Sequence, residues 1–237
     1  MSSSWAVYRA EQMIEVAPDV HHLPLGPRDA VNAYLVGDVL VDAGYAIQAK
    51  RVLKQLGERA GTVKAHALTH AHVDHAGGSR RVLDALDVPV WVGAGDAEAA
   101  YRGAPELPAG VKLRTLLEFY AGFDGIEVDR ELREGDELAA GFTVLEVPGH
   151  SPGHLAFWRE TDRVLIAGDV WFHMSVLTTK VGLREPLGPF TPDPAANRRS
   201  IRRLTELEPE VVCFGHGPVL RDATPALRAF ADGLPAE

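Results

Sequence analysis

Residues 69–78 read Thr69–His70–Ala71–His72–Val73–Asp74–His75–Ala76–Gly77–Gly78. Residues 65–68 indicate a short apolar strand that ends at Thr69, and residues 80–86 have the apolar spacing of a helix. The three imidazoles and the carboxylate therefore lie in a tight loop between a strand and a helix, where they converge on one point. Such a donor set is typical of a metal site. The alternative, a polar turn with histidines that only pack, would need a separate structural reason for each histidine.

The HxHxDH pattern of this loop resembles that of the metallo-β-lactamase superfamily of metallohydrolases. In that family a further His, an Asp and a last His follow in this order, each at the end of a strand. This chain supplies them as His150, Asp169 and His216, within residues 144–150, 164–169 and 211–217. The resemblance spans most of the chain, from about Val31 to His216.

The resemblance implies an α/β fold, namely an αβ/βα four-layer sandwich. Two mixed β-sheets face each other, helices lie on the outer faces, and the site runs along one rim. The order of the chain agrees with this fold. Each half contains a hairpin that ends in an Asp (Asp42 or Asp169), then a helix, then a strand that ends in a His (His70 or His216).

We expect residues 1–237 to form a single metallo-β-lactamase-like domain with an insertion at about 102–135. Residues 13–25 are predicted to form an edge strand and a turn. A hairpin with a two-residue Gly-Asp turn is predicted over residues 31–42. An amphipathic helix is predicted over residues 46–59.

Carried over residue by residue, the resemblance implies two divalent metal ions. The first is held by His70, His72 and His150, the second by Asp74, His75 and His216, and Asp169 bridges both. Three nitrogen ligands leave the first ion the open positions that a catalytic metal needs. Two ions about 3.5–4 Å apart can share a hydroxide that exists near neutral pH. The implied reaction is attack of this bridging hydroxide on an acyl carbon.

Two carboxylates are predicted to assist the metal ions. Asp74 is expected to act both as a ligand and as a proton acceptor. Asp42 is expected to orient a ligand through a hydrogen bond from outside the coordination sphere. The alternative for Asp42 is an ordinary turn residue before Gly44.

The other histidines have different predicted locations. His173 follows Asp169 closely and is a candidate to face the substrate, with simple packing as the alternative. His21 and His22 are predicted at the surface, and His66 within a strand of the core. His154 begins a strand, and both core packing and support of the site are consistent with that position.

The donor set narrows the choice of metal without fixing it. Imidazole and carboxylate ligands suit Zn, and they also suit Fe and Mn. We predict two Zn ions, with Fe or Mn as alternatives. His72 stands where flavodiiron relatives carry a carboxylate, which argues against that redox branch. A mononuclear iron site of the persulfide dioxygenase type stays open.

Composition and charge restrict the partners. The chain has 237 residues, 46% hydrophobic residues and a net charge of -9, which is typical of a globular protein and unfavourable for binding nucleic acid. The single Cys cannot form an internal disulfide. We find no signal peptide and no apolar run of membrane-spanning length, so we expect a cytoplasmic protein without a membrane partner. The oligomeric state stays open, and a homodimer is one alternative.

The chain also carries one concentrated basic face, on a predicted helix. Arg198, Arg199, Arg202 and Arg203 form it, and acidic residues follow at Glu206, Glu208 and Glu210. A solvated, charge-balanced surface explains this pattern better than a nucleic-acid site.

Two segments are predicted to cover the site and to set its specificity, namely residues 102–135 and a long loop over residues 171–192. Their apolar side chains are Leu113, Leu116, Leu117, Phe119, Tyr120 and Phe123 in the first segment, and Trp171, Phe172, Met174, Val176 and Leu177 in the second. These side chains suit a small acyl substrate held beside the metals, although some of them must pack the segments onto the sandwich.

The sequence therefore predicts a metal-dependent hydrolase of a small ester, thioester or lactone. The run over residues 148–154 resembles that of glyoxalase II-like hydrolases, and lactonases are close in motif. The alternatives are a mononuclear iron persulfide dioxygenase-like oxygenase, and a phosphodiesterase or nuclease on the same fold. A non-catalytic binding protein is disfavoured, because it would have no physical need for every ligand.

Overall fold

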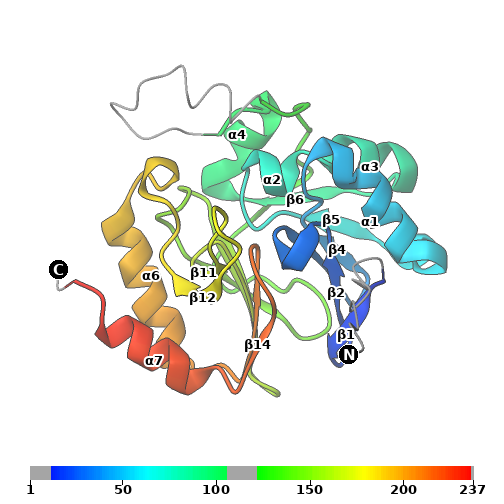
Figure 1. Ribbon diagram of the computed structural model, residues 1–237. Helices are drawn as coiled ribbons and strands as arrows, with labels where there is room; N and C mark the ends of the chain where they lie inside the picture. Colours follow the sequence, from blue (N-terminus) through cyan, green and yellow to red (C-terminus); the bar gives the residue numbers. More distant parts are fainter. Residues whose placement is uncertain (1–11, 106–121, 236–237) are drawn as a thin grey trace, which may run out of the picture.

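Two β-sheets face each other across the centre of the molecule, and helices cover the outer face of each (Figure 1). The computed structural model describes residues 12–105 and 122–235. Both sheets are mixed, so the arrangement is the αβ/βα sandwich that the sequence predicts. No helix in these described ranges is long and apolar enough to cross a membrane.

The first sheet has seven strands that follow one another in chain order. They are β1 (Ile14–Ala17), β2 (Val20–Pro24), β3 (Asn32–Val36), β4 (Val39–Val41), β5 (Ala65–Ala67), β6 (Val90–Gly93) and β7 (Arg130–Leu132). Strands β1 to β4 pair antiparallel. Two-residue turns join β1 to β2 and, as predicted, β3 to β4, whereas a longer connection with a 3-10 turn joins β2 to β3. Strands β4 to β7 pair in parallel through crossover connections.

The second sheet has five strands in the order β14-β13-β10-β9-β8. Their bounds are β8 (Thr143–Glu146), β9 (Leu155–Arg159), β10 (Val164–Gly168), β13 (Val211–Phe214) and β14 (Leu220–Arg221). Only β10 and β13 pair in parallel, whereas the other neighbours are antiparallel. A separate two-stranded sheet consists of β11 (Phe172–Met174) and β12 (Val181–Arg184).

The helices fall into two groups, one on each side of the sandwich. On the side of the first sheet lie α1 (Ala49–Leu56), α2 (Val73–Ala76), α3 (Ser79–Leu86) and α4 (Ala97–Arg102), and on the side of the second lie α6 (Pro194–Glu206) and α7 (Thr224–Asp232). Short 3-10 turns occupy Pro27–Asp29, Ala46–Gln48, Gly57–Thr62, Ala94–Asp96 and Gly188–Phe190. Asp193 caps α6, because its Oδ1 accepts a hydrogen bond of 2.8 Å from the Ala196 amide.

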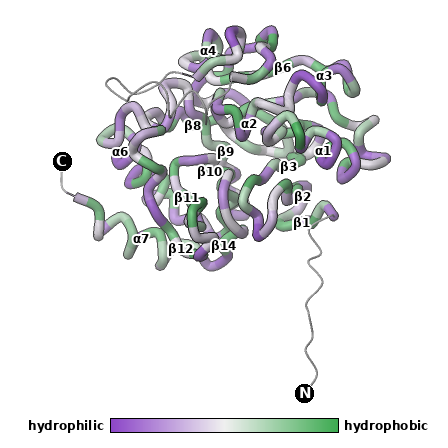
Figure 2. Tube along the Cα trace, turned by 45° about the horizontal axis from the view of Figure 1, so that its top comes forward, coloured by the Kyte–Doolittle hydropathy of each residue, from purple (hydrophilic) through white to green (hydrophobic). Residues whose placement is uncertain are grey.

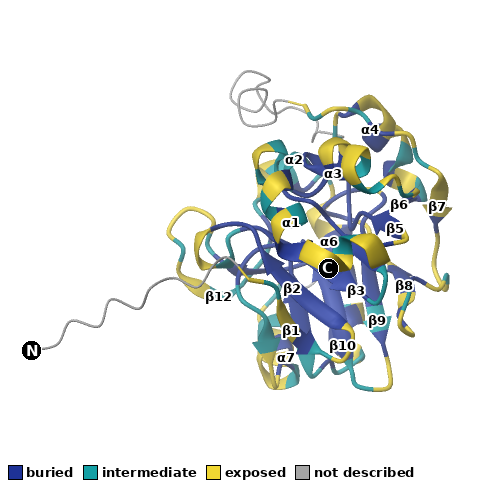
Figure 3. Cartoon of the chain, turned by 90° about the vertical axis from the view of Figure 1, so that its right-hand side faces the viewer, coloured by how far each residue is buried: buried dark blue, intermediate teal, exposed yellow. Residues whose placement is uncertain are grey.

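Hydrophobic residues form three layers in the sandwich. Between the sheets pack large side chains such as Tyr34, Phe142 and Phe157. Outside them, the apolar faces of α1 and α3 cover the first sheet, and those of α6 and α7 cover the second. Hydrophilic and hydrophobic residues alternate along α6 and α7 (Figure 2), as expected for helices with one buried face. The strands are mostly buried, whereas exposed residues gather on helices such as α3 and α4 (Figure 3).

Several segments differ from their sequence-based predictions. The segment expected to be an insertion at 102–135 contributes β7, which completes the first sheet, while its residues 106–121 lie outside the described ranges. The long loop over 171–192 contains the β11–β12 pair. Residues 13–25 form two paired strands instead of one. These strands are only three to five residues long, which is too short for a clear alternation of apolar and polar residues.

The end of β6 packs tightly against the loop between β8 and β9 of the second sheet. A Cβ at Gly93 would overlap the backbone carbonyl oxygen of Gly153, which lies between β8 and β9. We therefore expect Gly93→Ala to lower the free energy of unfolding by about 1–3 kcal/mol, the usual cost of forcing atoms into a packed region. Gly61→Ala is the control, since no described atom lies within 4 Å of its added Cβ. Urea unfolding of both variants checks this, and equal stabilities would contradict it.

Candidate metal centre

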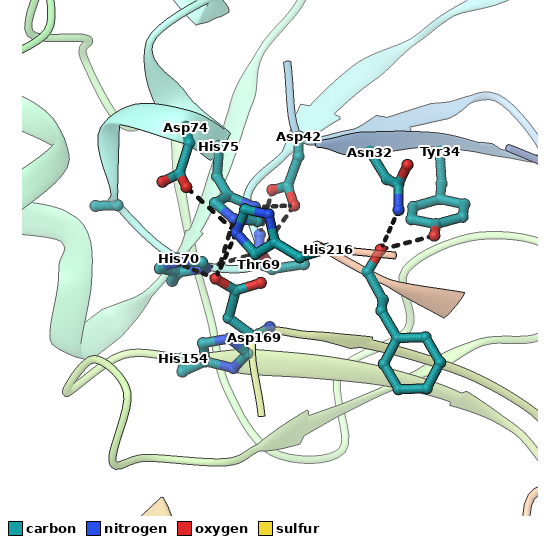
Figure 4. A network of polar contacts seen from close by, with 12 residues as sticks. Asn32, Tyr34, Asp42, Thr69, His70, Asp74, His75, His154, Asp169 and His216 are labelled. Atoms are coloured by element: carbon teal, nitrogen blue, oxygen red, sulfur yellow. Dashed lines mark hydrogen bonds and ion pairs between the residues drawn. The ribbon is translucent and has the colours of Figure 1, made fainter. Parts of the chain in front are cut away.

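The candidate ligands gather along one rim of the sandwich, where strands of both sheets end. His70 and His72 follow β5, and Asp74 and His75 lie on α2 directly after them. His150, Asp169 and His216 follow β8, β10 and β13 of the second sheet. Because β10 and β13 run in parallel, Asp169 and His216 emerge at the same edge. Figure 4 shows ligands from both sheets turned toward Asp169.

The donor atoms form two neighbouring groups. The first group is His70, His72 and His150, and the second group is Asp74, His75 and His216; the atoms of each group lie within 4.8 Å of one another. Asp169 Oδ2 stands between them. It lies 3.9 and 3.4 Å from Nε2 of His70 and His150, and 3.3 and 3.2 Å from Nε2 of His75 and His216. The structure thus brings all seven predicted ligands together, with Asp169 in the shared position.

Hydrogen bonds fix the imidazoles of the second group. His75 Nδ1 lies 2.8 Å from Asp42 Oδ2, and His216 Nδ1 lies 2.5 Å from the Ala30 carbonyl oxygen. Both partners can only accept, so each imidazole carries a proton on Nδ1. Nε2, the ring nitrogen left for a metal, then faces Asp169 in both residues, as it does in histidines that bind metals.

Two threonines fix the histidines of the first group in the same way. Thr69 Oγ1 donates to Asp42 Oδ2 at 2.8 Å, so it accepts from His70 Nδ1 at 3.0 Å. Thr191 Oγ1 donates to the Leu187 carbonyl at 3.2 Å, so it accepts from His150 Nδ1 at 3.3 Å. A hydroxyl has one proton, and its donation elsewhere leaves only the accepting role. His70 and His150 therefore direct Nε2 toward the centre as well.

The two groups differ in their electrostatics. Burial, together with His75 and His72, holds the pKa of His70 well below its ordinary value, and burial and His150 lower the pKa of His72 to about 3. In the second group burial is outweighed by carboxylates. Asp169 and Asp74 raise the pKa of His216 to about 10, and Asp169 and Asp42 raise that of His75. His70 and His72 of the first group are thus neutral imidazoles. The carboxylates that a cation requires come from Asp74 in the second group and from Asp169.

Several buried ligand atoms have no hydrogen-bond partner in the described chain, and a metal ion would satisfy them. Among the described residues, Nε2 of His70, His75 and His150 and Oδ1 of Asp169 have no hydrogen-bond partner. Buried polar atoms without partners cost free energy, and a cation at this point would satisfy them together. A Cβ at Gly215 would overlap Asp169 Oδ1 and approach His75, so glycine keeps this space open. Imidazoles and carboxylates suit Zn, Fe or Mn.

Asp42, predicted to orient a ligand, lies beside His75. Its carboxylate contacts His75 and also accepts hydrogen bonds from the Thr69 amide and hydroxyl, each at 2.8 Å. Asp96 has a comparable role that the sequence did not reveal. Asp96 Oδ2 accepts from the Ala71 amide at 2.9 Å and from Ser151 Oγ at 2.7 Å, which ties the loop of His70 to that of His150. Its position just after β6, like that of Asp42 after β4, was the available signal.

The remaining histidines lie outside the donor groups. His173 does not line the cavity beside the metal ligands; its Nδ1 lies 2.7 Å from the Pro218 carbonyl, and its ring packs against Phe214. His154 Nε2 accepts a hydrogen bond of 3.0 Å from the Asp169 amide, so it supports the site. His66 is buried as predicted, whereas His21 and His22 are buried instead of exposed.

A cavity of about 430 Å³ opens directly onto the metal ligands. Five ligands contribute to its wall, among them Asp74, whose side chain is 18% exposed. The rest of the wall is apolar apart from Tyr45 and consists of Ala30, Val31, Tyr45, Val73, Phe172, Val176, Leu177, Leu187 and Phe190. Of the side chains predicted to cover the site, Phe172, Val176 and Leu177 line the cavity, whereas Trp171 and Met174 are fully buried. Those at 113–120 lie outside the described ranges.

Residues 26–216 match the sequence model of the metallo-beta-lactamase superfamily. The chain belongs to this superfamily. A probable metallo-hydrolase of Bacillus subtilis, YflN, is 31% identical over 232 residues, which cover 86% of this chain and 85% of the relative. A hydroxyacylglutathione hydrolase of Bdellovibrio bacteriovorus is 32% identical over 150 residues, or 62% of this chain; the match spans only 46% of that relative.

Solved structures of the superfamily share the fold. TTHA1623, in a di-iron-bound form, superimposes with a TM-score of 0.66 and 34% identity, covering 86% of this chain and 96% of the other. These comparisons confirm the predicted superfamily and fold, and they support a metal-dependent hydrolase. They also agree with a site for more than one metal ion, without fixing which metal this chain binds.

The two donor groups predict about two metal ions per chain in the metal-replete protein. Elemental analysis after removal of loosely bound metal measures this number. One ion or none would contradict the two-ion assignment.

Asp169→Ala should impair metal binding more than Asp42→Ala. Asp169 faces both donor groups, whereas Asp42 acts through His75 and Thr69. Loss of an orienting partner lowers metal affinity or activity by about 10–100-fold, and we expect a larger loss for Asp169→Ala. Metal titration of the two variants compares them, and the reverse order would show that the roles are exchanged.

Proposed function

We propose that this chain hydrolyses an ester, thioester or lactone bond of a small substrate with an uncharged, apolar acyl group, using two divalent metal ions, preferably Zn. The observation that carries the proposal is the apolar cavity that opens onto the seven ligands. A cavity of this size suits a small molecule, and its wall matches an acyl chain better than a charged group.

Each candidate ligand is assigned to one or both metal positions. His70, His72 and His150 would hold one ion, Asp74, His75 and His216 the other, and Asp169 both. When bound, such a pair supplies a hydroxide nucleophile near neutral pH and polarises a carbonyl. Asp74 is the ligand carboxylate most open to the cavity, so it is placed to accept a proton there. Phe172 and Phe190 on the cavity wall exclude water beside the acyl group.

Charge disfavours a phosphodiester as the substrate. No Lys or Arg from the described ranges lines the cavity, so a phosphate would lack the basic partners that normally bind it. The basic face of α6 is neutralised locally, since Arg198 lies 2.7 Å from Glu185 and Arg203 lies 2.5 Å from Glu134. Both observations agree with the net charge of -9.

The relatives favour acyl chemistry and keep iron as an alternative metal. The Bdellovibrio bacteriovorus relative is named as a hydrolase of an acyl derivative of glutathione, which supports a thioester among the candidate substrates. The di-iron form of TTHA1623 makes Fe the alternative to Zn. An oxygenase is the second candidate function. Oxygen uptake together with iron content would favour it over hydrolysis.

Activity should increase with the length of the acyl chain. Each buried methylene contributes about 0.8 kcal/mol, or about fourfold in kcat/KM, until the cavity is filled. The measurement is hydrolysis of straight-chain thioesters and lactones, with bis-nitrophenyl phosphate and short RNA for comparison. Turnover confined to the phosphodiesters would overturn the proposal.

Two variants of the β11–β12 hairpin distinguish the effect of a residue that lines the cavity from that of an exposed residue outside it. Leu177 lines the cavity and is 81% exposed, so Leu177→Asp should fold normally and abolish the gain with chain length. Val181 is 53% exposed but does not line the cavity. Val181→Asp should therefore keep the dependence on chain length.

A further inference from the structure

Both polar atoms of the Asn32 side chain make hydrogen bonds at the rim. Its Nδ2 donates to the Phe214 carbonyl at 2.9 Å and to the Gly217 carbonyl at 2.8 Å. Its Oδ1 lies 2.8 Å from His22 Nε2, which therefore donates to it. This pattern also fixes which end of the amide is nitrogen. Asn32 is completely buried, so each of these bonds offsets a desolvation cost.

The two carbonyls that Asn32 holds lie on either side of His216. The backbone amide of Asn32 donates to the Gly215 carbonyl between them at 3.0 Å, and Tyr34 Oη donates to the Phe214 carbonyl at 2.8 Å. Asn32 and Tyr34 belong to β3 of the first sheet, whereas the segment of His216 follows β13 of the second. Figure 4 shows both side chains directed at the same carbonyl.

The clamp, defined as Asn32, Tyr34 and His22, acts on only one of the two donor groups. His22 stacks on Tyr34 with ring centroids 5.3 Å apart, which holds the partner of Asn32 in place. In the first group, His70 and His150 are held by Thr69 and Thr191 instead. A change in the clamp should therefore move His216 and leave the first group in place.

We propose that Asn32 is a positioning residue for the second metal position, because it fixes the segment that carries His216 through an amide that bridges two backbone carbonyls. The proposal rests on the two-ion assignment made above. It predicts that loss of the amide weakens the two metal positions unequally: the second group loses affinity, and the first group keeps it.

Asn32→Asp is the sharpest variant, because it keeps the shape of the side chain but removes the donation to two carbonyls. Gln55→Glu is the matched control. Gln55 is also a buried amide that donates to a backbone carbonyl, that of Pro24 at 3.1 Å. It lies on α1, and this hydrogen bond is to β2 and not to the segment of His216. Tyr34→Phe is the milder second variant, since the Phe214 carbonyl then keeps its bond from Asn32.

The experiment is calorimetric titration of Zn²⁺ into the metal-free proteins, with thermal unfolding measured in parallel. We expect two ions for the wild type and for Gln55→Glu. For Asn32→Asp we expect one ion of unchanged affinity and a second bound about 10–100-fold more weakly. The isotherm should resemble that of His216→Ala and differ from that of His150→Ala. Tyr34→Phe should show a smaller loss at the same position.

The possible outcomes separate this inference from the proposed function. A wild type that binds one ion defeats the two-ion assignment itself. A wild type that binds two ions, with Asn32→Asp unchanged, defeats only the role of Asn32. Equal weakening at both positions in Asn32→Asp and Tyr34→Phe, in step with their thermal stability, would show a general structural role and would also overturn the inference.

Discussion

Asp169 Oδ2 lies within 3.9 Å of the Nε2 atoms of four histidines, which reach it from both sheets. A fully buried carboxylate is tolerable only where positive charge compensates it. Each strand that ends at the rim must therefore place its side chain accurately. The bonds from Asp42, Thr69, Thr191 and the Ala30 carbonyl supply this accuracy by fixing the far side of each imidazole.

The ligands could be predicted from sequence because their signals are local. His150, Asp169 and His216 each follow an apolar run, and the ends of neighbouring strands meet at one edge. The residues that hold these ligands could not be predicted in this way. Thr191 is 41 positions from His150, and Ala30 is 186 positions from His216. Ala30 acts through a backbone carbonyl, which leaves no trace in the identity of the residue.

The errors of prediction have a related physical origin. His21 and His22 look like surface residues because imidazoles are polar, yet His22 is buried where Asn32 satisfies it. Strand β7 pairs with β6 through only three residues on each strand, so its alternation is too short to detect. His173 is close to Asp169 in sequence, but the alternation of β11 turns Phe172 into the cavity and His173 away from it.

Three residues of the cavity wall, Phe172, Val176 and Leu177, lie on the β11–β12 ribbon. This ribbon is hydrogen-bonded to neither main sheet as a strand. The ligands, in contrast, are anchored at the ends of the central strands. Recognition and chemistry are thus carried by separate pieces of the chain. In such an arrangement, the length and the side chains of the ribbon can change during evolution while the metal ligands stay the same. One scaffold can in this way support enzymes that share the same chemistry but accept different substrates.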